Sequence, residues 1–176
     1  MAYFARLGVD NVVVRVDSVD NRNAMTYNGI EKEELALEYL RKVHGNAGTW
    51  IKCSYNTVDG VHQLGGTPLR ANFPGGSNSD NPWYYHSEYD IFYKKQPIGC
   101  DSWTLNTTTG RWVPPLPEPE VTREQVEAGS YYRWDEDAYQ ADNTTGWKQV
   151  DLVTSAEVKL EALGLTKEDL KELLGM

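Results

Sequence analysis

The chain has 176 residues, of which 40% are hydrophobic, and a formal net charge of −9. Its 17 lysines and arginines form no basic block, and no apolar run approaches the roughly 20 residues of a membrane-spanning helix. Composition therefore argues against a nucleic-acid-binding protein and against an integral membrane protein. The N-terminus shows no signal-peptide pattern, so we expect synthesis and folding in a cytoplasm. Two cysteines, Cys53 and Cys100, are too few for a disulfide framework and are expected to be buried free thiols.

The chain opens with a pattern typical of a β-hairpin. Residues 3–7 and 12–19 are strand-like, and the turn residues 8–11 separate them. Residues 30–44 form the one clear helix of the first half, with acidic residues at its start and basic residues at its end. The apolar positions that predict its buried face recur near helical spacing: Ile30, Leu37, Leu40 and Val43.

The middle of the chain alternates strand patterns with a long loop. Residues 48–57 alternate as one strand, and residues 83–86 and 90–94 predict a second hairpin. Between them, residues 58–82 are dense in Gly, Pro, Asn and Ser, which predicts an irregular loop of unusual length. Such a loop either makes specific contacts or is mobile.

Two segments, "WTLNTTTGRWV" and "WDEDAYQADNTTGWKQV", share a layout of Trp, polar residues, an Asn-Thr-Thr turn with Gly, and a second Trp. We interpret them as two copies of a Trp-hairpin, in which the turn glycine supplies a left-handed residue. If the loop of the first hairpin takes four residues, Trp103 is expected to face Trp112 across the pair. The tryptophans could fix the hairpins to the main sheet, contact a protein partner, or offer a platform for a sugar ring.

The second half divides by composition. Residues 1–113 form a β-rich body, and the prolines that open residues 114–129 predict an extended connector. Residues 130–153 carry the second Trp-hairpin, and residues 154–176 are helical, with Ser155 as a first cap. Thr166 and Asp169 resemble a capping box for a second short helix.

The expected fold class is therefore α+β, mainly antiparallel β-hairpins, with one amphipathic helix at about residues 30–44 and a short helical C-terminal tail. The tail carries a leucine stripe that could bind a partner or fold back on its own sheet. The candidate partner-binding residues are the four tryptophans of the paired segments and the leucines of the tail: Trp103, Trp112, Trp134, Trp147, Leu163, Leu165, Leu170, Leu173 and Leu174.

No set of residues indicates catalysis. His44, His62 and His86 lie in unrelated contexts, and the chain has no zinc-protease, redox-cysteine, P-loop or nucleophile-elbow motif. Residues 135–143 are acidic but lack the glycine and final glutamate of a calcium loop, so a solvated turn is expected. We predict no enzyme activity, no cofactor and no metal site.

The order of several short motifs resembles a group of small virion structural or virion-associated proteins of marine tailed bacteriophages, cyanophages in particular. The motifs are an opening strand pair, "GTWIKCSYNT" followed by "GVH", "LRANF", a Tyr-rich strand, "SWTLNTTTGRW" followed by prolines, and "YRWDEDAYQ". They fall within residues 3–140. The chain departs from the family pattern after "LRANF", where its loop is enlarged.

This resemblance implies a non-enzymatic virion protein, made in the bacterial host cytoplasm, that docks on a capsid or tail assembly through protein–protein contacts. Its partners would be other virion proteins or copies of itself. The alternative is a host-surface glycan-binding module of a tail fibre, which requires solvent-exposed Trp103, Trp112 or neighbouring tyrosines.

Overall fold

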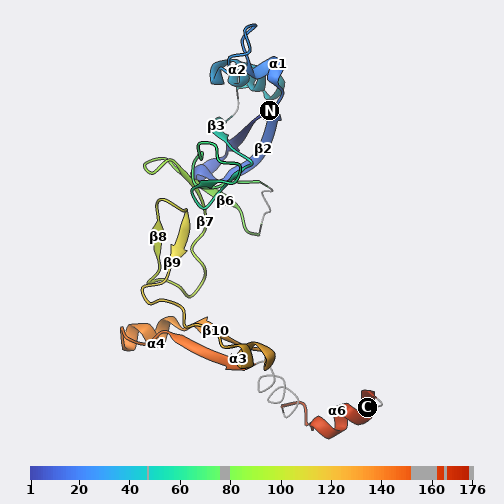
Figure 1. The fold of residues 1–176 in the computed structure, drawn as a ribbon, viewed down its shortest axis with the longest axis vertical. Coiled ribbons are helices and arrows are strands. Elements are labelled where there is room, and N and C mark those ends of the chain that lie inside the picture. Colours follow the sequence, from blue (N-terminus) through green and yellow to red (C-terminus); the bar gives the residue numbers. More distant parts are fainter. Residues whose placement is uncertain (47, 76–79, 152–161, 165, 175–176) are drawn as a thin grey trace. The chain divides into compact units, whose positions relative to one another are not determined.

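The computed structural model describes the chain except residues 47, 76–79, 152–161, 165 and 175–176. It is an α+β fold of antiparallel strands, mostly in two-stranded hairpins, with a few short helices, which confirms the expected fold class (Figure 1). The chain divides into two compact units. Unit 1 holds Met1–Gln96 and Thr104–Val113, and unit 2 holds Pro97–Trp103 and Pro114–Met176.

Unit 1 is built on a three-stranded antiparallel sheet in the order β2-β1-β3, formed by β1 (Ala2–Leu7), β2 (Val13–Val19) and β3 (Thr49–Cys53). Both faces of the central strand β1 are covered, because its alternate residues enter two different clusters of buried side chains. Phe4, which is fully buried, belongs to the cluster that the helices cover, including α1 (Asn21–Ala24).

Helix α2 (Glu33–His44) covers the same face as α1. Its buried residues are Ala36 and Leu40, whereas Ile30 and Val43 are more than half exposed. The prediction that Ile30 and Val43 belong to the buried face was wrong. Ile30 lies before the first turn of the helix, and the buried stripe runs with a spacing of four residues from Ala36 through Leu40 to His44, whose ring lies 5.4 Å from that of Trp50.

The opposite face of the sheet is covered by a hairpin of β6 (Trp83–His86) and β7 (Ile91–Lys94), close to the ranges expected from sequence. Phe92 is fully buried and belongs to the second cluster together with Leu7 and Val13. Two further hairpins complete the unit: β4 (Thr57–Val58) with β5 (Val61–His62), and β8 (Thr104–Asn106) with β9 (Arg111–Val113).

Unit 2 contains a two-stranded antiparallel ribbon of β10 (Ser130–Trp134) and β11 (Trp147–Asp151). The ribbon is not a simple hairpin, because helix α4 (Glu136–Ala141) lies in the connection between its strands. Helix α3 (Arg123–Glu127) precedes it, within the segment expected to be an extended connector. The prolines end at residue 119, and Thr122 then opens α3 with a capping box.

Helix α6 (Lys167–Leu174) is the last described element. The predicted capping box is present, since the Thr166 backbone N–H donates to Asp169 Oδ2 at 2.6 Å and the Asp169 N–H donates to Thr166 Oγ1 at 3.1 Å. The predicted cap at Ser155 falls outside the described residues.

Candidate partner-binding surfaces

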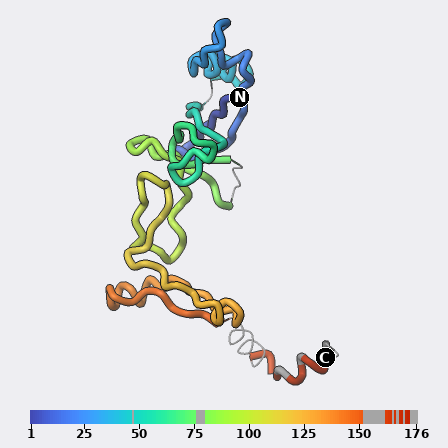
Figure 2. The backbone as a smooth tube through the Cα atoms, viewed as in Figure 1, coloured from blue at the N-terminus to red at the C-terminus, as the bar shows by residue number. Residues whose placement is uncertain are grey.

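The described part of the long loop after β3 is held by its own short hairpin and by polar contacts within unit 1. Thr57 is fully buried at its start. The Thr57 side-chain oxygen accepts a hydrogen bond from the Leu69 N–H, and its carbonyl accepts one from the Phe73 N–H, both at 3.0 Å. The path of the backbone through this loop is drawn in Figure 2.

Asn72 is the centre of this loop. Its Oδ1 accepts from the Asp59 N–H at 3.0 Å, and its Nδ2 donates to the carbonyls of Phe92 and Thr109 at 3.1 and 2.8 Å. One buried amide thus joins the loop, strand β7 and the turn between β8 and β9. A buried amide with its partners satisfied favours one arrangement, because every alternative leaves polar groups unpaired.

Two arginines also hold this loop, through hydrogen bonds and ion pairs. Arg70 donates from Nη1 to the Lys52 carbonyl and from Nε to Asp90 Oδ1, each at 2.7 Å. Arg111 forms a two-bond ion pair with Asp59, in which Nη2 lies 2.6 Å from Oδ2. The motifs "SYNT", "VDG", "RANF" and "NTTTGR" therefore meet in space, although no single one of them indicates this.

On this braced loop, four large apolar side chains are exposed within ten residues of chain. Val58 and Val61 are direct cross-strand partners on β4 and β5, with exposed fractions of 44% and 59%. Tyr55 is 64% exposed and Leu64 78%. We call these four residues the loop surface. Sequence analysis did not select them, because a Gly-rich loop gives no periodic signal for which residues face solvent.

The first tryptophan pair does not face across its hairpin, so that prediction was wrong. Asn106 pairs with Arg111 around a four-residue turn, which places Trp112 opposite Leu105 and leaves Trp103 outside β8. Trp112 is half-buried, and its indole N–H donates to the Lys94 carbonyl at 2.8 Å.

Trp103 instead joins the second pair. Trp134 and Trp147 are cross-strand partners with ring centroids 5.3 Å apart at 77°. Trp103 lies 6.1 Å from Trp134, also edge to face, and 6.2 Å from Trp147. The structure thus brings together three of the four candidate tryptophans, with Tyr139 at 5.2 Å from Trp134. We call these four aromatic residues the Trp cluster; none of them is exposed.

A carboxylate organises the polar edge of the Trp cluster. Glu136 accepts hydrogen bonds from Gln140 Nε2 at 2.8 Å and from the Trp134 indole N–H and Ser102 Oγ at 2.9 Å. These donors, with Gln140 and Trp134 contributing most, lower the pKa of Glu136 to about 2. The acidic residues expected to form a solvated turn therefore begin helix α4, with Asp135 as its cap.

Gly146 is required for packing and not for a left-handed turn. Gly110 has the expected positive φ of 68°. The backbone of Gly146 does not have a positive φ. A Cβ at Gly146 would lie 2.5 Å from the Trp134 ring. The two Trp segments are therefore not copies of one hairpin: the first closes by a four-residue turn, and the second contains a helix.

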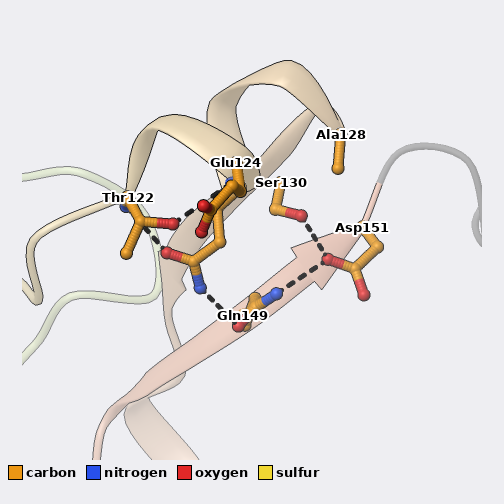
Figure 3. Close-up of a pocket in the computed structure, with 7 residues that line it drawn as sticks. Thr122, Glu124, Ala128, Ser130, Gln149 and Asp151 are labelled. Carbon is orange, nitrogen blue, oxygen red and sulfur yellow. Dashed lines mark hydrogen bonds between the residues drawn. The ribbon is translucent and has the colours of Figure 1, made fainter.

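An open depression of about 660 Å³ lies beside the ribbon in unit 2 (Figure 3). Its side chains form one chain of hydrogen bonds: Gln125 Nε2 donates to Gln149 Oε1, while Gln149 Nε2 and Ser130 Oγ both donate to Asp151 Oδ1. The Ser130 and Gln149 donors lower the pKa of Asp151. The carboxylate therefore joins β10 to β11, whereas Gln125 links α3 to the ribbon through Gln149, and a carboxylate with a lowered pKa is poorly suited to general-base chemistry near neutral pH.

The three histidines do not form a common site in the described part of the chain, and of the candidate leucines only Leu163 has a described side chain. Leu163 is 74% exposed, whereas Leu165 and the side chains of Leu170, Leu173 and Leu174 fall outside the described residues. Each histidine has different neighbours: His44 Nε2 lies 2.7 Å from Asp17 Oδ2, His62 Nδ1 accepts from two loop N–H groups, and His86 lies against Tyr89.

Among the described residues, no group of three or more His, Cys, Asp or Glu is placed to hold a metal ion, and no helix has the length and apolarity to cross a membrane. Comparison with protein-family models, curated proteins and solved structures finds no match to this chain.

Proposed function

We propose that this chain is a non-enzymatic structural protein of a bacteriophage virion, an accessory component that docks on the capsid or tail through protein–protein contacts. The motif order provides the virion assignment. The loop surface carries the docking assignment, because it presents four exposed apolar side chains on a loop held by Asn72 and by the Arg111–Asp59 ion pair.

The physical argument concerns both area and rigidity. Fully burying an exposed valine or leucine contributes about 1.5–3 kcal/mol, and the loop surface holds three such residues, Val58, Val61 and Leu64, beside the larger aromatic side chain of Tyr55. Because polar contacts already fix the loop, a partner would not have to order it, which lowers the entropic cost of binding.

The alternative of a glycan-binding module requires that Trp103, Trp112 or neighbouring tyrosines present an open ring face to a sugar. None of the candidate tryptophans is exposed. Trp103, Trp134 and Trp147 pack against one another, and Trp112 is bonded through its N–H to Lys94. The tryptophans therefore support docking more than sugar binding, and exposed tyrosines such as Tyr55 and Tyr131 are the residues through which the alternative would act.

The test uses phage particles produced with a tagged copy of this chain and purified on a density gradient. We expect the native chain to co-sediment with particles and the double variant Val61→Ser/Leu64→Ser to be lost from them. The control is Ile98→Ser, a change at a fully exposed residue of unit 2.

Absence of the native chain from particles would refute the virion assignment. Normal incorporation of the double variant would refute docking through the loop surface. Circular dichroism of each purified variant verifies that it is folded.

A further inference from the structure

A second depression, of about 510 Å³, lies in unit 1 where the turn between β1 and β2 meets the start of β3. Its walls come from three elements of the sheet. They include Arg6 from β1, Val9 and Asn11 from the turn, Val14 from β2 and Thr49 from β3. Val9 and Val14 are exposed, at 83% and 43%, so the depression combines one cation with apolar side chains that face water.

Arg6 is a half-buried cation on the central strand. Its direct cross-strand neighbours are Arg15 on β2 and Trp50 on β3. Like charges placed directly opposite each other destabilise a sheet. Arg15 is compensated by Asp17, with Nε 2.7 Å from Oδ1, whereas no ion pair or hydrogen bond of the Arg6 side chain occurs in the described part of the chain.

The lining of the depression contains no acidic residue, although the chain carries 26. Asp10 belongs to the turn but does not line the depression. Asn11 and Thr49 add neutral polar groups. Gly48 also matters, because a Cβ there would lie 3.1 Å from Arg6 Cγ and crowd the arginine stem.

We infer that this depression binds the carboxylate of an acidic residue that lies next to an aliphatic residue in an extended segment of a partner protein. A guanidinium binds a carboxylate through two parallel hydrogen bonds, and such a pair is stronger when partly removed from water. Val9 and Val14 would contact the neighbouring aliphatic side chain. Strand β3 is an edge strand of the sheet, and an extended segment would approach it beside Thr49, away from the Lys52 carbonyl to which Arg70 donates.

This inference rests on the proposed docking function, since it names the chemistry of one contact with the partner. The test is independent of particles. The full-length protein, labelled with ¹⁵N, is titrated with the blocked tripeptide Val-Glu-Val and followed by the amide signals of Gly8, Gly48 and Thr49 and by the Nε signal of Arg6.

We expect saturable shifts with a Kd of about 1 mM, as befits a single small contact. Val-Gln-Val, which has the same shape without the charge, should bind at least about tenfold more weakly. Arg6→Gln should abolish the shifts, and the matched control Arg22→Gln, at an exposed arginine of α1, should not.

Val9→Asp provides a second variant in case Arg6→Gln fails to fold. It adds a carboxylate at an exposed position on the rim and should also abolish binding of Val-Glu-Val. Equal binding of the Glu and Gln peptides, absence of binding to the native protein, or unchanged binding in folded Arg6→Gln or Val9→Asp would each overturn the inference. Binding of inorganic phosphate without binding of Val-Glu-Val would also overturn it, because the site would then be a simple oxyanion site.

Failure of the native protein to bind the peptide would leave particle incorporation unaffected. Failure of incorporation would leave peptide binding unaffected. The two proposals are therefore separable.

Discussion

Substitution of Gly110 by alanine should destabilise unit 1 far more than the same substitution at Gly65. Both glycines lie in unit 1 with left-handed backbones, at φ of 68° and 73°. A Cβ at Gly65 meets nothing within 4 Å, whereas a Cβ at Gly110 would lie 2.6 Å from both Asn72 Nδ2 and the Phe92 carbonyl oxygen. Comparison of the two variants therefore distinguishes the cost of a left-handed alanine, present in both, from the cost of the steric clash with Asn72, present only in Gly110→Ala.

The magnitudes follow from these two contributions. A left-handed alanine costs about 1–2 kcal/mol, which is the whole effect expected at Gly65→Ala. At Gly110 the clash also displaces the Asn72 amide from its two carbonyl acceptors, and a buried donor left without a partner costs about 1–3 kcal/mol. Gly110→Ala should therefore lose about 2 kcal/mol more than Gly65→Ala.

Native-state amide hydrogen exchange is the suitable assay, because it reads unit 1 through the slowest amides of β1. A difference of 2 kcal/mol corresponds to about 30-fold faster exchange in Gly110→Ala than in Gly65→Ala. Equal exchange in the two variants would show that the turn packs loosely on Asn72 and would refute the central role assigned to that amide.

Three further outcomes are expected. Because folding lowers the pKa of Glu136 from 4.5 to about 2, its contribution to stability should be present above pH 4.5 and lost as the pH falls toward 2. In urea titrations at several pH values, Glu136→Gln should lose less stability than the native protein between pH 4.5 and 2, and Glu118→Gln should lose as much as the native protein; an unchanged loss in Glu136→Gln would assign the pH dependence to other carboxylates, such as Asp151. Burial raises the pKa of the Cys53 thiol to about 12. In a Cys100→Ser variant, Ellman's reagent should therefore react with Cys53 at neutral pH only after the protein unfolds. Rapid reaction with the native protein would contradict the buried position of this thiol. Trp112→Phe removes the hydrogen bond to Lys94 and should lower the unfolding free energy by about 1 kcal/mol, measured by urea denaturation, whereas no change would mean that water replaces the indole donor.

The elements that the sequence predicts well are those with local signals. Alternating and β-branched residues located β1, β2, β3 and the β6–β7 hairpin within a few residues, and the paired Thr166 and Asp169 identified the start of α6. These features depend on neighbours close in sequence, so a single chain suffices to recognise them.

The errors concern register and tertiary contact. A shift in register changes which side chains face each other, and the turn after Asn106 places Trp112 opposite Leu105, two residues beyond Trp103. Gly146 looks like a turn glycine in the sequence, but the indole of Trp134 is what excludes a side chain there. Helix α3 was not predicted, because the prolines before it dominate the composition of residues 114–129 and indicate an extended connector.

The candidate sites show the same limit. The tryptophans were recognised as a group, but only the structure assigns three to one cluster and the fourth to another unit. The loop surface and the depression beside Arg6 depend on Asn72 and on cross-strand neighbours far apart in sequence, for which an isolated chain gives no periodic signal.

The placement of residues 104–113 in unit 1 has a consequence for synthesis on the ribosome. Asn72 and Thr109 are separated by 37 residues, and the β8–β9 turn supplies the acceptor that completes the amide's bonding. At about 5–20 residues per second, translation delivers that turn roughly 2–7 s after Asn72 itself. During this interval strands β1, β2 and β3 are already available to pair, while Asn72 lacks the Thr109 acceptor throughout and the Phe92 acceptor until 20 further residues have been made. The nascent protein therefore acquires its braced loop late, as a separate step after the β1–β3 framework has been made.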